Sequence, residues 1–563
     1  MEYKWNIKQE FDETLFRTYQ AEHDMLDEAL DDFIHVNNIG FNHPRNLSNI
    51  EKAVARTKKA LENKETIFIS GDYDVDGVTS TASMFLVLSQ LTAGKVDYII
   101  PSRKTGYGMN KQMVDYMYDS GCKLIITVDN GIASHDIIKY AESLGMDVIV
   151  TDHHLPQGEM PCDIVVNPHT SPDYPFKNIC GCFVAYKFLQ MLVPNLHRMP
   201  IHSDLIAFVT LATIADVMPL QNENRKFVKN GLEYIRAGKV NNLGFNALIK
   251  MLKLDMTHLT SGNIAFYLAP AINAIGRIDN AEMAVMLLTS EDEAKVDEMA
   301  KKAVDFNNKR KDIQSRIMDT VKIDEKEEFI IKILNEAPLG IMGIIAGNFA
   351  HKYNRPCIIL HENGKGVLNG SGRSVGNFDI EQCIVNNSDI VSGGGHKAAC
   401  GIKAMLPENV DEFKKRCCAS FKQYLLENKE DIVPTLDILC PVSIMHLDDE
   451  FMFALEQLSP FGQDNPELMF VDYRLVVDEY SFFKDDKFLR MTLSNPFATI
   501  SAVGFADVKD KYVALGCPKM IDIVYNVEYN YFRGRKIELM IRDLKATPKS
   551  EQPDFMKMQK KPD

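Results

Sequence analysis

Three aspartates at alternate positions follow a short apolar run early in the chain. The segment 67–80, IFISGDYDVDGVTS, places Asp72, Asp74 and Asp76 directly after what the apolar residues predict to be a buried strand. Carboxylates crowded at a strand end repel one another, and a bound cation would neutralise them. Two interpretations are open at this point: a divalent-metal site, or a solvated acidic turn, since such runs also occur in calcium-binding loops.

Two later strand ends carry further residues of metal-binding type. Asp129 follows the apolar run 124–128, and His153 and His154 follow the run 148–150. Because the carboxyl ends of parallel strands meet at one edge of a sheet, we expect these side chains to lie close to the first three aspartates. Convergence from three strands favours the metal site over the acidic turn.

The ligand types narrow the choice of ion. Carboxylate and imidazole donors without thiolate suit Mn²⁺ or Mg²⁺, with Zn²⁺ as a further option. There are more candidate ligands than one catalytic ion needs, so we expect two ions about 3.5–4 Å apart. That arrangement is typical of phosphoester hydrolysis, where one ion helps to deprotonate a water and both stabilise charge in the transition state.

Alternating strands and helices over residues 66–193 must position these groups. Strands are expected at 67–69, 96–100, 124–128, 148–150 and 164–166, with helices at 78–91 and 135–144. This alternation predicts an α/β fold with a doubly wound parallel sheet.

A second α/β unit is expected within residues 328–428. Apolar runs predict strands at 329–334 and 357–360, and GIMGIIAGNFAHK predicts a helix at 340–352. A long exposed helix, 291–315, precedes this unit. Its lysines and arginines have two interpretations: a solvated helix face, or the lining of a strand-binding cleft between two lobes.

Two glycine-rich segments in the second unit also have two interpretations. Residues 370–374, GSGRS, and 393–396, GGGH, offer hydroxyls, backbone N–H donors, an imidazole and the guanidinium of Arg373. Glycine lets the backbone approach an anion closely, and arginine grips phosphate with two hydrogen bonds. The alternative is two ordinary glycine turns, with Arg373 in a structural ion pair.

The last third of the chain changes character. Short β-rich runs with even spacing over residues 436–545 predict a small Greek-key barrel. Aromatic residues lie among basic ones at 480–490 and 529–535, a pattern that suits a single strand of nucleic acid because bases stack on aromatic rings. Most of these aromatics must still belong to the core. The polar tail 548–563 is expected to be disordered.

Bulk composition limits the class of protein. The net charge of −15 argues against a generally basic nucleic-acid binder but allows a local basic groove. The 11 cysteines have neither zinc-ribbon nor disulfide-framework spacing, which favours a reduced, cytoplasmic compartment. Residues 1–10 lack the apolar stretch of a secretory signal, and no apolar run is long enough for a membrane span. We therefore expect a soluble protein.

The motifs together resemble the RecJ branch of the DHH phosphoesterase superfamily. The resemblance covers residues 50–547 and implies a DHH domain, a long linker helix, a second α/β domain of DHHA1 type and a C-terminal OB-fold barrel. It is carried by GDYDVDG (71–77), PSRKTGYGMN (101–110), VDNG (128–131), TDHH (151–154), LATIADVMPL (211–220), LAPAINAIGRI (268–278), GSGRS (370–374), GGGHKAACG (393–401) and LSPFGQDNPE (458–467).

The resemblance implies a 5′-to-3′ exonuclease that degrades single-stranded DNA to 5′-mononucleotides with two Mn²⁺ or Mg²⁺ ions, in DNA repair and recombination. It assigns metal binding to Asp72, Asp74, Asp76, Asp129, His153, His154 and Asp216, and catalysis to Asp76, His153 and His154. Asp152 receives a structural role, and His154 also contacts the scissile phosphate. Nucleic-acid or 5′-phosphate binding is implied for Arg103, Tyr107, Asn273, Arg277, Ser371, Arg373, Gly394, Gly395 and His396.

The same resemblance implies boundaries and partners. The expected parts are an N-terminal extension (1–49), the DHH catalytic domain (50–220), a helical linker region (221–325), the DHHA1 substrate-binding domain (326–430), the OB-fold domain (431–547) and the tail (548–563). Single-stranded DNA is the expected partner of a monomer. A RecQ-type helicase and a single-strand-binding protein are expected by family analogy.

Two positions depart from the family pattern. Ala271 stands where the family usually has arginine, and Ala337–Pro338 stands where it usually has Trp–His. These changes bear on substrate affinity or end recognition, because the metal-ligand motifs are intact. Two other functions stay open: a DHH phosphodiesterase of short oligoribonucleotides or cyclic dinucleotides, and a non-catalytic single-strand-binding scaffold.

Overall fold

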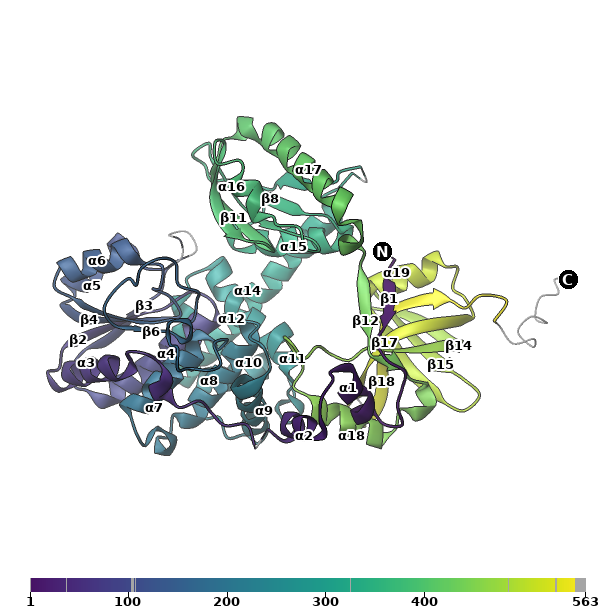
Figure 1. Cartoon of the computed structure of the whole chain (residues 1–563), viewed down its shortest axis with the longest axis horizontal. Coiled ribbons are helices and arrows are strands. Elements are labelled where there is room, and N and C mark those ends of the chain that lie inside the picture. Colours follow the sequence, from purple (N-terminus) through teal and green to yellow (C-terminus); the bar gives the residue numbers. More distant parts are fainter. Residues whose placement is uncertain are drawn as a thin grey trace. The chain divides into compact units, whose positions relative to one another are not determined.

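The computed structural model describes residues 2–36, 38–102, 106, 108–324, 326–484, 486–531 and 534–551, with backbone alone at 430 and 431. The described chain forms two compact units (Figure 1). Unit 1 comprises residues 1–38, 433–461 and 466–563, and unit 2 comprises residues 39–432 and 462–465. No helix among the described residues is long and apolar enough to cross a membrane.

Unit 2 begins with a five-stranded parallel sheet in the order β3-β2-β4-β5-β6. Its strands are β2 (Thr66–Ser70), β3 (Val96–Ile99), β4 (Cys122–Val128), β5 (Asp147–Thr151) and β6 (Val165–Val166). These are the strands that the apolar runs predict, and the parallel order confirms the doubly wound sheet.

Helices cover both faces of this sheet. They are α3 (Ile50–Glu62), α4 (Val75–Leu91), α5 (Lys111–Asp119), α6 (His135–Ser143), α7 (Gly181–Leu192) and α8 (His202–Ala215). Side chains alternate along a strand, so Ile67 and Ile69 of β2 pack into the same core cluster as residues of α3, α4 and α7, whereas Phe68 packs with residues of α5 and α6. Figure 1 shows α5 and α6 on one side of the sheet and α3 and α7 on the other.

A buried ion pair ties α7 to the helix after α8, which is α9 (Asn222–Arg236). Lys187 donates to Glu223 over 2.8 Å and to the backbone oxygen of Asn42 over 2.7 Å. The Tyr174 hydroxyl donates to the other Glu223 oxygen over 2.5 Å. Both charged side chains are about 1% exposed.

We predict that Lys187→Met lowers the thermal stability of unit 2. The methionine leaves the Glu223 carboxylate buried without its counter-charge, which costs about 3–5 kcal/mol. The melting temperature from calorimetry is the measurement. Lys295→Met is the matched control, because Lys295 is 72% exposed and forms only a surface pair with Asp292. Equal melting temperatures for the two variants would contradict the prediction.

A helical region follows the sheet domain in unit 2. It contains α10 (Leu243–Met251), α11 (Ser261–Asn263), the π-helical turn η5 (Ile264–Leu268), α12 (Ala269–Ile278), α13 (Glu282–Thr289) and α14 (Glu293–Thr320). The long helix expected at 291–315 is α14. It packs along α10 and α12, with Val296, Ala300 and Ala303 buried.

The second sheet of unit 2 is mixed, in the order β10-β11-β9-β8-β7. Its strands are β7 (Ile330–Ile333), β8 (Cys357–Glu362), β9 (Leu368–Arg373), β10 (Val391–His396) and β11 (Ala399–Met405), with helices α15 (Met342–Tyr353), α16 (Glu381–Val385) and α17 (Val410–Glu427). Only β7 and β8 are parallel.

The two glycine-rich segments are strands of this sheet, so the alternative of ordinary glycine turns is wrong. Gly372 pairs with Cys400, and Gly394 pairs with Gly401. A β-carbon at Gly395 would lie 2.3 Å from the backbone oxygen of Ala399. Glycine is therefore needed there because the two strands approach closely. Composition alone does not distinguish a glycine of this kind from one in a turn.

Unit 1 contains a closed five-stranded barrel. Its strands are β14 (Phe470–Phe483), β15 (Phe488–Ser494), β16 (Thr499–Gly504), β17 (Met520–Asn530) and β18 (Lys536–Ala546), and pairing of β14 with β17 closes it. The expected small barrel is confirmed. The helices α18 (Asp449–Leu458) and α19 (Ala506–Ala514) of this unit were not expected from the sequence.

The N-terminal residues belong to the barrel unit. Strand β1 (Lys4–Ile7) pairs in parallel with β12 (Thr435–Ile438), as Figure 1 shows beside the barrel. Helices α1 (Leu15–Glu22) and α2 (Asp27–His35) contribute to the barrel's core cluster. The paired strands are more than 400 residues apart in the sequence, so no local sequence pattern predicts that they pair.

Candidate metal centre

The loop after β2 is tightly folded around its aspartates. Asp74 is the N-cap of α4, and its Oδ1 accepts the backbone N–H of Gly77 over 3.0 Å. A β-carbon at Gly77 would lie 2.5 Å from the backbone oxygen of Asp72. The close contact brings Asp72 and Asp76 to the start of the helix, where both are buried.

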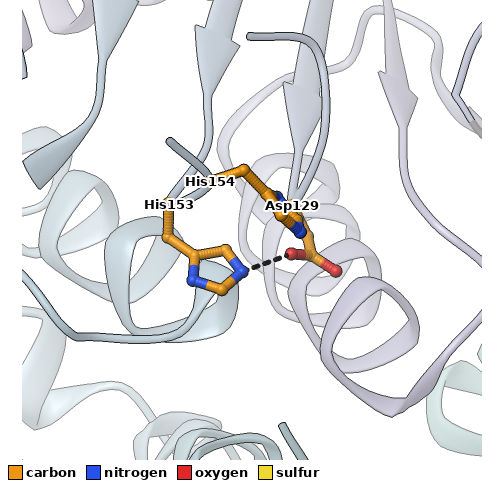
Figure 2. Close-up of side chains that lie close together, drawn as sticks. All are labelled: Asp129, His153 and His154. Atoms are coloured by element: carbon orange, nitrogen blue, oxygen red, sulfur yellow. Dashed lines mark ion pairs between the residues drawn. The ribbon is translucent and has the colours of Figure 1, made fainter. Parts of the chain in front are cut away.

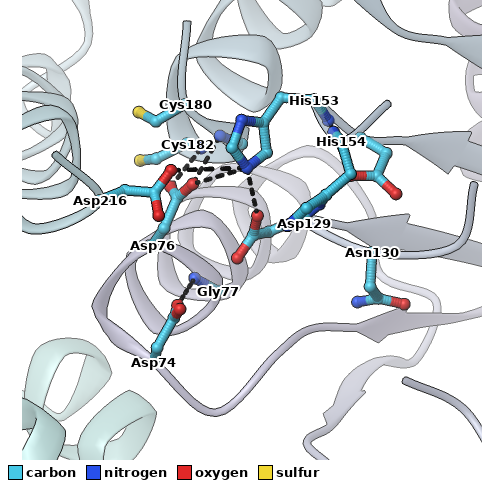
Figure 3. Close-up of polar contacts among 12 residues, drawn as sticks. Asp74, Asp76, Gly77, Asp129, Asn130, His153, His154, Cys180, Cys182 and Asp216 are labelled. Carbon is cyan, nitrogen blue, oxygen red and sulfur yellow. Dashed lines mark hydrogen bonds and ion pairs between the residues drawn. The ribbon is translucent and has the colours of Figure 1, made fainter. Parts of the chain in front are cut away.

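The start of α7 holds the Asp76 carboxylate. The backbone N–H groups of Gly181 and Cys182 donate to its two oxygens over 2.6 and 2.7 Å (Figure 3). These are N–H groups that a helix leaves unpaired in its first turn, and the positive end of the helix dipole favours the carboxylate. Helix α7 thereby fixes the orientation of Asp76.

Asp129 adopts an unusual backbone conformation at the end of β4. Its φ is +60°, in the left-handed region that aspartate tolerates better than most residues. The next residue, Asn130, donates through its side chain to the backbone oxygens of Ser70 and Val128 over 3.0 and 2.9 Å. Asn130 thus ties the end of β2 to the end of β4, and this places Asp129 beside the first loop.

His153 stands at the centre of the carboxylates. Its Nε2 lies 3.1 Å from Asp129, 3.6 Å from Asp216 and 3.7 Å from Asp76. Figure 2 shows the imidazole directed at the Asp129 carboxylate, and Figure 3 shows all three acids around it. Asp216 arrives from the C-terminal end of α8. Four separate elements therefore deliver these side chains to one point.

Asp152 supports the second histidine. Its Oδ1 lies 2.8 Å from the Nδ1 of His154 and accepts the backbone N–H groups of His153 and His154, and its Oδ2 accepts the N–H of Ile132. Burial opposes charge on His154, but the Asp152 hydrogen bond and nearby carboxylates outweigh it and raise the pKa to about 9. This is the structural role that the sequence predicts for Asp152.

Burial and the repulsion between neighbouring carboxylates raise the pKa values of two acidic side chains at this centre. Burial first, then the charge of Asp76, raises the pKa of Asp129 well above its ordinary range and that of Asp216 to about 8. Burial lowers the pKa of His153, which favours the neutral imidazole that binds metals. Burying several ionised carboxylates together destabilises the folded state unless a positive charge compensates for them.

The donor atoms fit divalent cations. Three overlapping groups each place ligand atoms within 4.8 Å of one another: Asp129, His153 and His154; Asp76, His153 and Asp216; Asp72, Asp74 and Asp129. Among the described residues, the buried His153 Nε2 and Asp216 Oδ2 make no hydrogen bond. Cys180 and Cys182 lie nearby (Figure 3), but burial and the Asp76 charge raise the pKa of Cys182 to about 12, so its thiol stays protonated. Oxygen and imidazole donors suit Mn²⁺ or Mg²⁺.

We predict that the metal-free protein loses stability as the pH rises. The pKa of Asp216 increases from 3.8 to about 8 on folding, so within this window the folded state binds more protons than the unfolded chain. The free energy of unfolding therefore falls as the pH rises through the window. In calorimetry with EDTA, the melting temperature of Asp216→Asn is expected to fall less between about pH 5 and pH 8 than that of the original protein. Identical pH slopes would contradict this.

The candidate phosphate-binding residues gather around the start of α15. Arg277 Nη1 donates to the backbone oxygen of Gly340 over 2.6 Å, and Arg373 Nη1 donates to Ser371 over 3.1 Å. A β-carbon at Gly343, one turn further on, would lie 2.9 Å from Arg373 Nη2 and 3.1 Å from Ser371 Oγ. Arg277 reaches this place from α12, and the other two from β9.

Arg373 forms no ion pair with a carboxylate among the described residues, contrary to the structural-pair interpretation. Its guanidinium is half-buried, and burial lowers its pKa. A half-buried cation without a counter-charge, beside the N–H groups of a helix start, suits an anionic ligand.

The remaining sequence-predicted residues are less closely grouped. Asn273 lies on α12, and its buried Oδ1 makes no hydrogen bond with described residues. Gly394, Gly395 and His396 lie on β10, where the Gly395 N–H donates to Glu381 over 3.0 Å. Arg103 and Tyr107 lie outside the described residues.

Sequence reasoning missed two residues that shape the site. Asn130 belongs to the VDNG motif, so its position beside Asp129 was a usable signal. Gly181 had no signal beyond being a small residue before an apolar helix. A β-carbon there would lie 2.6 Å from the Asp129 Cβ, so only glycine lets α7 approach both Asp76 and Asp129.

Family models match three segments of the chain. The DHH family N-terminal domain matches residues 66–213, the DHHA1 domain matches 326–423, and the RecJ OB domain matches 438–543. The first segment contains the three strand ends described above, and the second contains the residues around the start of α15.

Curated proteins and solved structures are similar along most of the chain. The single-stranded-DNA-specific exonuclease RecJ of Bacillus subtilis is 34% identical over 526 residues, which cover 91% of this chain but 65% of that protein. RecJ of Escherichia coli is 31% identical over 75% of this chain and 78% of that protein. The crystal structure of Thermus thermophilus RecJ in complex with Mn²⁺ has a TM-score of 0.80 at 25% identity, covering 97% of this chain and 80% of that one.

Proposed function

The chain belongs to the RecJ family, and from this we propose that it is a metal-dependent exonuclease that degrades single-stranded DNA from the 5′ end to 5′-mononucleotides. The observation that carries the proposal is the meeting of Asp76, Asp129 and Asp216 around His153. A cluster of acidic and imidazole side chains that can bind two divalent cations is typical of enzymes that hydrolyse phosphodiesters.

The proposed ligands are Asp72, Asp74, Asp76, Asp129, His153, His154 and Asp216. Two Mn²⁺ or Mg²⁺ ions bound there would supply a nucleophilic water and neutralise charge on the scissile phosphate. The chain's own residues fix the geometry: α7 orients Asp76, Asn130 positions the end of β4, and Asp152 holds His154. Asp152 holds the His154 ring through Nδ1, so Nε2 is the atom that we propose would bind an ion when the ring is neutral, or contact the scissile phosphate when the ring is protonated.

End recognition is proposed at the start of α15. Arg277, Ser371 and Arg373 would hold the 5′-terminal phosphate, supported by the half-buried guanidinium of Arg373 without a carboxylate partner among described residues. Asn273, Gly394, Gly395 and His396 are proposed to extend this surface, as are Arg103 and Tyr107. A site that requires a terminal phosphate explains a 5′-to-3′ direction, because an internal nucleotide cannot supply one.

The barrel is proposed to bind the single strand. Two of its half-buried aromatic rings lie beside cations: Lys484 is 5.2 Å from the Phe488 ring, and Arg490 is 4.8 Å from the Phe483 ring. Bases stack on such rings without sequence preference. The proposed domains have the bounds 50–220, 221–325, 326–430 and 431–547, with the extension 1–49 and the tail 548–563.

Family membership also leads us to propose the setting. We expect a cytoplasmic monomer in DNA repair and recombination, working beside a RecQ-type helicase and a single-strand-binding protein. Light scattering after gel filtration tests the monomer, since a mass near twice the 63.7 kDa of the chain would contradict it.

The test of the proposed activity is digestion of an end-labelled single-stranded 30-mer with Mn²⁺. Its duplex, an RNA version and 5′-phosphorylated and 5′-hydroxyl forms are compared, with Asp76→Ala and His153→Ala as inactive controls. Stepwise mononucleotide release from the 5′ end supports the exonuclease. Binding without cleavage would instead favour a scaffold, and cleavage of only the shortest RNA would favour an oligonucleotide phosphodiesterase.

Arg373→Gln separates end recognition from hydrolysis. We expect it to raise KM for the 5′-phosphorylated strand while leaving the 5′-hydroxyl strand almost unaffected. Equal effects on both strands would contradict a phosphate contact at Arg373.

A further inference from the structure

Two adjacent aromatic side chains project from the π-helical turn η5. Phe266 is 69% exposed and Tyr267 is 46% exposed, whereas Ile264 and Leu268 at the ends of the same turn are fully buried. The buried ends anchor the turn, so the two rings are held at the surface by a fixed backbone. π-Helical turns recur at functional sites, because they offset side chains from the regular helix positions.

A cation of α14 lies beside one of these rings. Lys311 Nζ is 5.9 Å from the centroid of the Tyr267 ring, within the range of a cation–π contact. The preceding residue, Arg310, is half-buried, and its buried Nε makes no hydrogen bond within the described part of the chain. No carboxylate there pairs with Arg310 either, and burial lowers its pKa. The described residues thus offer the Arg310 guanidinium no carboxylate counter-ion.

Exposed rings, a lysine beside one of them and a neighbouring arginine without a carboxylate partner among the described residues match the chemistry of a nucleic-acid single strand. Bases stack on aromatic rings while cations contact the phosphates, and each stacked base contributes about 1–3 kcal/mol. The bases of a duplex already stack on each other, so a duplex cannot offer their faces to Phe266 and Tyr267. We propose that Phe266, Tyr267, Arg310 and Lys311 form a stacking platform for the single-stranded substrate; this rests on the proposed function.

The platform is connected to the metal centre through one helix. Turn η5 continues directly into α12, and a β-carbon at Gly276 of α12 would lie 2.9 Å from the backbone oxygen of Tyr73. Tyr73 stands between Asp72 and Asp74. Nine residues separate Tyr267 from Gly276, about 14 Å along a helix, or about four nucleotides at the rise of stacked DNA.

The first experiment measures stacking directly. A 5′-phosphorylated single strand carries 2-aminopurine at successive positions, and its fluorescence is recorded with the full chain in EDTA, so that no cleavage occurs. We expect quenching at a position about four nucleotides from the 5′ end, and loss of that quenching in Phe266→Ala and Tyr267→Ala. Quenching that persists in both variants would overturn the platform.

The second experiment measures affinity by fluorescence anisotropy. Each ring-to-alanine change is expected to weaken binding of the 30-mer about 5- to 150-fold. Arg310→Gln is expected to reduce the slope of log affinity against log salt by about 0.7, the contribution of one single-strand phosphate. Met286→Ala, which removes a 49%-exposed apolar side chain from α13, is the matched control. Affinity in the ring variants equal to that of this control would overturn the proposal.

The outcomes separate the two proposals. Equal Mn²⁺ affinity in all variants shows that the metal centre is intact and the variants are folded. An original protein that cleaves no single strand contradicts the proposed function. An original protein that cleaves the strand, with Phe266 and Tyr267 variants that bind it normally, contradicts the platform alone.

Discussion

Replacing Asp129 with asparagine is expected to abolish most single-strand cleavage and, at the same time, to stabilise the metal-free protein. The amide keeps the shape of the side chain but loses the charge that faces His153 Nε2 at 3.1 Å. Removing one charged group from a preorganised catalytic centre costs about 10²–10³ in rate, or about 3–4 kcal/mol of barrier.

The gain in stability follows from the crowding of charge. Burial and the charges of Asp76, Asp74, Asp72 and Asp216 raise the pKa of Asp129, so its ionised form is unfavourable in the folded state without a cation. Asparagine removes that repulsion. We therefore expect the melting temperature of Asp129→Asn in EDTA to exceed that of the original protein. With Mn²⁺ the order should reverse, because only an intact site gains stability from tight binding.

Calorimetry with and without Mn²⁺ tests the expected change in stability, and the 30-mer assay tests the expected loss of cleavage. Asp119→Asn is the control, because Asp119 is exposed at the C-terminal end of α5. A lower melting temperature for Asp129→Asn in EDTA, or cleavage at the original rate, would contradict the account of the site.

Gly181→Ala is expected to weaken Mn²⁺ binding about 10- to 100-fold without touching a ligand atom. The new β-carbon would lie 2.6 Å from Asp129 Cβ and 2.8 Å from Asp129 Oδ1, so α7 must move away. The N–H groups of Gly181 and Cys182 then lose their 2.6 and 2.7 Å contacts with Asp76. Asp76 keeps its charge but loses its orientation.

Titration calorimetry with Mn²⁺ measures this effect apart from activity. At saturating Mn²⁺ we expect kcat to recover most of its original value, since the ligands themselves are intact. Gly40→Ala is the control, because a β-carbon at Gly40 has nothing within 4 Å. An unchanged Mn²⁺ affinity would show that the start of α7 does not position Asp76.

The sequence predicted the parts of the site that depend on local pattern. Asp72, Asp129 and His153 each follow an apolar run, and parallel pairing of those runs brings the residues together, so strand recognition sufficed. Gly181 could not be predicted, because its importance is a contact with Asp129, more than fifty residues away. The glycines of β9 and β10 were ambiguous for a similar reason: glycine serves turns and closely paired strands alike.

The parallel pairing of β1 with β12 has a consequence for synthesis. Lys4–Ile7 is made before its partner, Thr435–Ile438, which follows more than 400 residues later. At translation rates of about 5–20 residues per second, the first strand waits about 20–90 s for its partner. During that time residues 39–432 of unit 2 are made, so the nascent chain can fold most of its catalytic unit while β1 still lacks its partner strand. Slower translation lengthens the exposure of that unpaired edge, which makes the barrel unit the part of the molecule whose folding yield is sensitive to elongation rate.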